Sequence, residues 1–202
     1  HARGFDRRAG GPLAGTGNPQ TAANPRAHLL VNVSAMDSSQ EIIQIVDENN
    51  VEIGAMSRWL MREQNLIHRA SYVLVFNSRD ELFVQQRTLN KDIYPGYHDI
   101  AAGGVVMAGE SYEESAKREL AEELGIRDVS LVPCFDHYYE DARNRVWGRV
   151  FRCRHEGPFT LQPEEVASGR FMPLDQVMAL SQSEPFTPDG IEILQRLRAN
   201  GD

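Results

Sequence analysis

The stretch GGVVMAGESYEESAKRELAEELGI, residues 103–126, carries the strongest structural signal in the chain. Ser111 is followed three residues later by Glu114, which is the capping-box pattern of a helix start. Gly125 stands where a helix commonly stops, because glycine adopts the left-handed backbone conformation without strain. We therefore expect a helix over about residues 112–124.

Two faces of this helix differ in chemistry. At about 100° per residue, an apolar stripe runs along one face, and Glu119, Glu122 and Glu123 gather beside it at i, i+3 and i+4. Carboxylates at this spacing repel one another by roughly a few tenths of a kcal/mol per pair. Mg²⁺ or Mn²⁺ would offset that repulsion, since hard divalent cations prefer oxygen ligands. On the cluster alone, a solvated acidic face is the commoner alternative.

The wider spacing resembles the Nudix box. Gly104 is followed after five residues by Glu110, and after seven more by RELAEELGI at residues 118–126. The resemblance implies an α/β fold, an α/β/α sandwich with a mixed central sheet. It also implies a metal-dependent hydrolase, a pyrophosphatase that cleaves the diphosphate linkage of a nucleoside diphosphate derivative.

The same resemblance assigns roles within the box. Four groups match the metal ligands of the family: Glu119, Glu122, Glu123 and the backbone carbonyl of Gly103. The carbonyl of Gly104 is the alternative to the last of these. Arg118 would hold a neighbouring carboxylate, and Glu110 would reach towards the cluster from before the helix. Glycine at these positions lets the main chain pass close to metal and phosphate, where a Cβ would intrude.

Attack of metal-activated water on phosphorus is the mechanism that the resemblance implies, and a general base would assist it. In related enzymes the base is either a box glutamate or a glutamate of a later loop. Glu164 and Glu165 lie in the matching later segment, LQPEEVASGRF. We expect Glu165 to act, although a solvated loop acid explains either residue equally well.

The sequence before the box is similar to Nudix proteins related to isopentenyl-diphosphate isomerase, and the similarity covers most of residues 40–175. The isomerases use a cysteine and a metal held largely by histidines. The cysteine position falls at Gly103 and a histidine position at Val105, so neither group is present. His68 matches an isomerase metal ligand, but a structural role is commoner for a single histidine. These differences favour hydrolysis over isomerisation.

A non-catalytic Nudix domain that binds a nucleotide is the other alternative. Such domains often lose box glutamates, and this chain keeps them. Three residues near the entrance to the box are candidates for substrate binding: Arg87, Lys91 and Tyr97. Arginine and lysine suit phosphates, and an aromatic ring suits a base. Packing explains the same residues as well.

Composition limits the remaining functions. The 202 residues, 41% of them hydrophobic, are enough for one domain with a sizeable core. A net charge of −8 disfavours a nucleic-acid duplex as partner. No apolar run approaches the roughly 18 residues of a membrane span. Cys134 and Cys153 are too few for a disulfide framework, so we expect a cytoplasmic enzyme acting on a small phosphoanhydride. A homodimer is common for such enzymes, but no residue here indicates one.

Residues 1–35 are rich in Gly, Pro, Ala and Asn and show no sustained periodicity. We interpret them as a flexible extension, either an expression leader or an upstream-translated segment, ahead of a Nudix domain at residues 36–202. Within that domain the patterns predict a hairpin and a short helix up to residue 64, then further strands and two closing helices. The predicted later strands are 70–77, 82–87, 99–102, 131–139, 145–154, 159–162 and 169–172, and the closing helices are 174–181 and 189–199.

Overall fold

A nine-stranded mixed sheet forms the centre of the computed structural model, which describes residues 38–199. Strand β3 (His68–Phe76) pairs antiparallel with β6 (Ala102–Val105) and parallel with β8 (Arg145–Arg154). The other strands are β1 (Ile42–Val46), β2 (Glu52–Ser57), β4 (Leu82–Arg87), β5 (His98–Asp99), β7 (Val132–Glu140) and β9 (Val166–Met172). The expected tail and its boundary after residue 35 lie outside the described residues.

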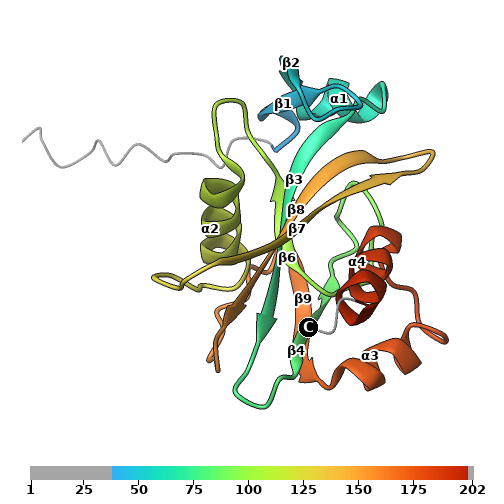
Figure 1. Ribbon diagram of the computed structural model, residues 1–202. Coiled ribbons are helices and arrows are strands. Elements are labelled where there is room, and N and C mark those ends of the chain that lie inside the picture. The colour runs from blue at the N-terminus through green and yellow to red at the C-terminus, as the bar shows by residue number, and fades with distance from the viewer. Residues whose placement is uncertain (1–37, 200–202) are drawn as a thin grey trace, which may run out of the picture. The chain divides into compact units, whose positions relative to one another are not determined.

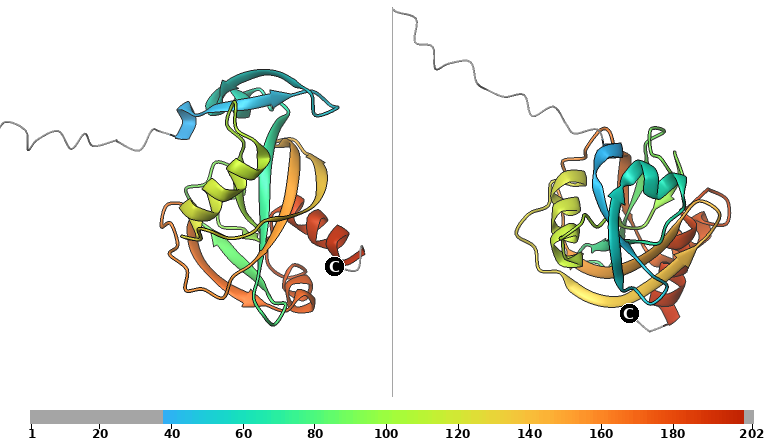
Figure 2. Two further views of the ribbon diagram at one scale, coloured as in Figure 1. Left: turned by 60° about the vertical axis from the view of Figure 1, so that its left-hand side comes forward. Right: turned by 90° about the horizontal axis from the view of Figure 1, so that it is seen from above.

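Helices cover both faces of this sheet, as Figures 1 and 2 show. The helices are α1 (Arg58–Glu63), α2 (Tyr112–Glu123), α3 (Leu174–Leu180) and α4 (Pro188–Ala199), after a short 3₁₀ turn at Ser38–Gln40. Because successive side chains of a strand point to opposite faces, Val73 and Val75 pack in the core beneath α2, and Leu74 packs in the core beneath α3 and α4. The predicted α/β/α sandwich is confirmed. None of the helices of residues 38–199 is long and apolar enough to cross a membrane.

The box helix α2 begins and ends where the sequence predicts. The Ser111 side chain accepts a hydrogen bond from the Glu114 amide, and the Glu114 carboxylate accepts one from the Ser111 amide. Leu124 caps the other end, and Gly125 follows with φ +70°. These two ends set the bounds of α2, and its packing against β3 and β6 sets the direction of the glutamates.

The prediction of a strand at residues 159–162 is wrong. Its backbone pairs instead with the end of α2: the amide of Thr160 donates to the carbonyl of Leu124, and the amide of Gln162 donates to that of Glu123. The last carbonyls of a helix have no partner within the helix, so this extended segment satisfies them in place of a sheet neighbour. The expected strand at 99–102 is also displaced, because β5 ends at Asp99 and β6 begins at Ala102.

Candidate active site

The three box glutamates of α2 differ sharply in exposure. Glu123 is only 3% exposed. The Glu119 side chain is 13% exposed, whereas that of Glu122 is 52% exposed. Glu119 and Glu123 therefore point towards the sheet, and Glu122 lies at the rim. The i, i+3 and i+4 spacing in the sequence places all three glutamates on one face of the helix and does not predict this difference in exposure.

Glu123 is held against the sheet by uncharged donors. Its Oε2 accepts hydrogen bonds from the amide of Gly103 and from Nε2 of Gln85, both at 3.3 Å. The Lys91 ammonium lies 3.9 Å from the other oxygen, Oε1. Burial, and then the negative charge of Glu119, raise the pKa of Glu123 to about 7. Additional positive charge beside Glu123 would therefore favour its ionised form.

Arg118 joins the glutamates into one network. Its Nε and Nη2 donate to the two carboxylate oxygens of Glu110 at 2.9 and 3.0 Å. Its Nη1 lies 2.7 Å from Glu119 and 3.3 Å from Glu122. This two-pronged geometry is specific to a guanidinium. Arg118 therefore contacts carboxylates from before α2 and on it, in the position that the resemblance implies.

Two glycines of β6, Gly103 and Gly104, lie so close to neighbouring groups that a side chain would collide with them. A Cβ at Gly103 would lie well within 3.0 Å of the Ser71 carbonyl oxygen on β3. A Cβ at Gly104 would lie within 3.0 Å of the carboxylate of Glu119, which is the end of a flexible side chain. Position 103 is therefore closed to side chains by the sheet backbone, whereas a side chain at position 104 would displace the Glu119 carboxylate.

The loop between β4 and β5, residues 88–97, borders the glutamates. Lys91 from this loop contacts the carboxylate of Glu165, which follows Glu164 just before β9. The loop and the later segment also meet through main chain, since Thr88 donates from its amide to the Glu165 carbonyl and from its hydroxyl to the Glu164 carbonyl. The fold thus brings Glu165 beside the box through Lys91.

The other two candidates for substrate binding have different surroundings. The Arg87 guanidinium donates to Asp99 at 3.1 Å and to the carbonyls of Ile93 and Tyr94, so it anchors the loop. The ring of Tyr97 lies 5.7 Å from that of Tyr94 and is not part of the cavity lining. Of the three candidates, only Lys91 lies next to a box glutamate.

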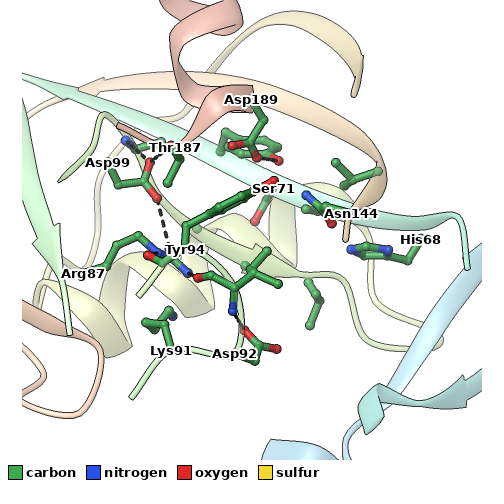
Figure 3. Close-up of a pocket in the computed structure, with 18 of the residues that line it drawn as sticks. His68, Ser71, Arg87, Lys91, Asp92, Tyr94, Asp99, Asn144, Thr187 and Asp189 are labelled. Carbon is green, nitrogen blue, oxygen red and sulfur yellow. Dashed lines mark hydrogen bonds and ion pairs between the residues drawn. The ribbon is translucent and has the colours of Figure 1, made fainter. Parts of the chain in front are cut away.

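A polar cavity of about 70 Å³ lies beside Gly103 and Gly104 (Figure 3). His68 and Asn144 lie on one side of it, and Asp99, Thr187 and Asp189 on the other. His68 is buried, and burial lowers its pKa to about 3, so the ring is neutral near pH 7. Its Nδ1 lies 3.1 Å from the Leu66 carbonyl, which gives His68 a structural bond as well as a place in the lining.

Several residues near the glutamates are ones that the sequence did not indicate as candidates. Gln85 faces the same side of β4 as Phe83, and a polar residue that interrupts an apolar strand face is the signal that could have found it. Arg58 and Arg62 lie four residues apart on α1, and both line the cavity together with Asp92. Nothing in the local sequence connects these three, because tertiary contacts alone bring α1 to the loop.

The donor chemistry of the site suits a hard divalent cation. Carboxylate oxygens of Glu119, Glu122 and Glu123, with main-chain carbonyls of β6, are ligands of the kind that Mg²⁺ takes. Burial is the first cause of the raised pKa of Glu119 and of Glu123, so additional positive charge at this pair would favour the ionised carboxylates. Within residues 38–199, no three acidic, histidine or cysteine side chains already converge as a metal site. The residues therefore fit a divalent cation in the chemistry of their oxygen ligands, while Arg118 contacts two of the glutamates, Glu119 and Glu122.

Comparisons with known proteins show which family the chain matches. The NUDIX domain family matches residues 66–197. An uncharacterized Nudix hydrolase of Pseudomonas aeruginosa is 44% identical over 158 residues, which cover 78% of this chain and 94% of that protein. The uncharacterized Nudix hydrolase YfcD of Escherichia coli is 43% identical over 157 residues, covering 78% of this chain and 86% of that protein.

Solved structures share the fold. The crystal structure of DR0079 from Deinococcus radiodurans has a TM-score of 0.69 at 24% identity and covers 77% of this chain and 98% of that one. The NUDIX domain of Shewanella oneidensis NrtR, complexed with ADP ribose, has a TM-score of 0.53 at 18% identity, covering 66% and 88%. With the family match extending over most of the described residues, the chain belongs to the Nudix hydrolase family.

Proposed function

We propose that this protein hydrolyses the diphosphate linkage of a nucleoside diphosphate derivative with the help of Mg²⁺ or Mn²⁺. The observation that carries the proposal is the pair of Glu123, which is buried, and Glu119, which is partly buried, facing the Gly103–Gly104 backbone next to Lys91 and a cavity. Glu119, Glu122, Glu123 and the carbonyl of Gly103 would hold the cations. The Shewanella oneidensis domain with bound ADP ribose is consistent with a substrate of this class.

The chain's own residues would divide the work. A bound divalent cation supplies positive charge that neutralises phosphate oxygens and makes water more acidic. Glu165 would accept the proton of the attacking water, and its contact with Lys91 keeps that carboxylate near Glu123. Lys91 would also offset charge on the phosphate. Arg118 would position Glu110, Glu119 and Glu122 through its fixed fork of donors.

Isomerisation gains no support from the geometry at position 103. A cysteine there would place its Cβ against the Ser71 carbonyl, so this sheet register leaves no space for the isomerase nucleophile. Charged groups such as Arg58, Arg62 and Asp92 line the cavity beside apolar residues, and a hydrocarbon chain would strip these groups of water without replacing their hydrogen bonds.

A substrate panel tests the proposal. Nucleotide sugars, dinucleotides, coenzyme A and nucleoside triphosphates would be incubated with the protein and Mg²⁺ or Mn²⁺, and released nucleoside monophosphate and phosphate would be measured. We expect at least one diphosphate-linked compound to be cleaved, and chelation of the metal to stop the reaction. Saturable nucleotide binding with no cleavage across the panel would favour the non-catalytic alternative.

Replacing Glu165 by Gln is expected to lower kcat by about 100-fold, because a general base contributes roughly 10²–10⁴-fold to rate. The change keeps the size of the side chain and removes the proton acceptor. Glu164→Gln is the matched control, since its side chain is exposed and its carbonyl, which Thr88 contacts, is unchanged. Equal kcat values for the two variants would assign the base to a box glutamate instead.

A further inference from the structure

Helix α1 presents two arginines to the cavity beside the box. Arg58 and Arg62 are one helical turn apart, and both line the cavity. Their side chains are only 19% and 17% exposed. Two guanidiniums on one face of a helix repel each other, so their placement together needs negative charge nearby.

Two carboxylates, Asp92 and Glu41, face the two guanidiniums, and Asp92 is shared between them. Nε of Arg58 and Nε of Arg62 both donate to the same oxygen, Oδ2 of Asp92, at 3.2 Å. Arg58 has a second carboxylate partner in Glu41 at 3.1 Å. The other partner of Arg62 is the uncharged Asn144 side chain at 3.0 Å. Burial lowers the pKa of Arg62, and the positive charge of Arg58 lowers it further.

Donor capacity is also left over. Among the hydrogen bonds formed within residues 38–199, neither Nη2 of Arg58 nor Nη2 of Arg62 has an acceptor. Neither nitrogen is a buried atom without a partner, so both are open to water or to a ligand in the cavity. A guanidinium with free N–H groups on a cavity wall is suited to bind phosphate oxygens, because its planar fork matches their spacing.

The size and polarity of the cavity limit which chemical groups of a ligand can bind in it. Its volume of about 70 Å³ is far below the roughly 300–1,000 Å³ of pockets that bury drug-sized ligands. A nucleoside therefore does not fit inside it, whereas a compact anionic group does. The same cavity touches Gly103 and Gly104, so a ligand held there lies next to the proposed metal ligands.

We propose that Arg58 and Arg62 form a subsite for a second phosphate group of the substrate, one that is not cleaved. The subsite rests on the proposed function in one respect: the diphosphate to be cut lies at the glutamates of α2. The substrate class is then a nucleoside diphosphate derivative that carries an additional phosphate. Binding at the subsite would position the scissile linkage against Glu119 and Glu123 and select against analogues without the extra phosphate.

A binding experiment without metal tests the subsite independently of catalysis. Inorganic phosphate would be titrated into the protein by calorimetry at constant ionic strength in the presence of EDTA. We expect Arg62→Gln to weaken phosphate binding by about 10-fold, since it removes a charge-assisted hydrogen bond. Arg79→Gln is the control: it removes the same charge from a side chain that is 70% exposed in the β3–β4 turn, and it should leave the affinity unchanged.

The substitution Asp92→Asn is expected to change the phosphate affinity in the opposite direction. Asn keeps the size of the side chain and removes the negative charge that the two guanidiniums share, so phosphate should bind several-fold more tightly. Loss of structure cannot produce that gain. Absence of phosphate binding to the wild-type protein, equal affinity in Arg62→Gln, or a loss of binding in Lys91→Gln alone would overturn the subsite.

Pairs of substrates then test whether the phosphate bound at the subsite is part of the substrate. The pairs are coenzyme A with dephospho-coenzyme A, and NADPH with NADH, which differ by one phosphate. We expect wild-type kcat/KM to favour the phosphorylated member and Arg62→Gln to reduce that preference by about 10-fold. An unchanged preference would overturn the assignment to substrate. Failure to cleave any compound would count against the proposed function, and the metal-free titration would still decide whether the anion site exists.

Discussion

Replacing Glu123 by Gln is expected to lower kcat by about 1,000-fold while the fold stays intact. Glutamine has nearly the same shape as glutamate but is a much weaker ligand for a hard cation. Removing one group that stabilises developing charge in a closed site typically costs 10²–10³-fold in kcat. Steady-state kinetics with Mg²⁺ on the best substrate of the panel measure the change.

Glu113→Gln is the matched control for this loss. Glu113 lies on the same helix, its side chain is 58% exposed, and its only partner among the described residues is Lys117, at i+4. Surface pairs of this kind contribute little, so wild-type kcat is expected in the control. Wild-type kcat in the Glu123 variant as well would reject the proposed metal cluster.

The metal-free stability of the Glu123 variant should depend on pH differently from that of the wild type. Folding raises the pKa of Glu123 from 4.5 to about 7, so the folded state binds the proton more tightly than the unfolded state. Below pH 4.5 both states are protonated and no penalty exists. As pH rises from 4.5 through 7, the wild type should lose on the order of 3 kcal/mol more stability than the Gln variant, which keeps the other carboxyl groups with raised pKa, Glu119 and Asp99. Urea unfolding in EDTA at pH 5 and pH 8 measures this difference.

Replacing Gly103 by Ala is expected to lower the free energy of unfolding by about 3 kcal/mol or more. The added Cβ would meet the Ser71 carbonyl, which is backbone of the central strand β3 and cannot rotate away. Overpacking of a well-packed interior typically costs 1–3 kcal/mol, and here a pair of strands would have to separate. Urea unfolding followed by circular dichroism gives the value.

Gly54→Ala is the control for glycine removal from a strand. Gly54 lies on β2, and a Cβ there has nothing within 4 Å. Its stability should stay equal or rise slightly, because glycine in a strand is entropically unfavourable. If Gly103→Ala were as stable as Gly54→Ala, β6 would have to lie further from β3, and the space at position 103 would again admit an isomerase-like cysteine.

The sequence by itself determined the box helix and the layers of the fold. The capping box at Ser111, the glycine at 125 and the grouping of the three glutamates depend on rotation and hydrogen bonding within about four residues, which a linear pattern contains. A layered α/β arrangement follows from strands interleaved with helices, and the resemblance to the Nudix box implies the α/β/α order of the layers. The segment at 159–162 was misread because an extended backbone can pair with helix carbonyls as well as with a strand.

The tertiary structure alone decided which groups meet. Glu119 and Glu123 face the sheet while Glu122 is exposed, because the rotation of α2 is set by its packing on β3 and β6. Lys91 reaches Glu165 across 74 residues of sequence, and Arg58 reaches Asp92 across 34. Distances of this kind depend on strand register and loop path, which no local pattern encodes. The box therefore locates the glutamates in the sequence, and the three-dimensional contacts decide which side chains lie around them.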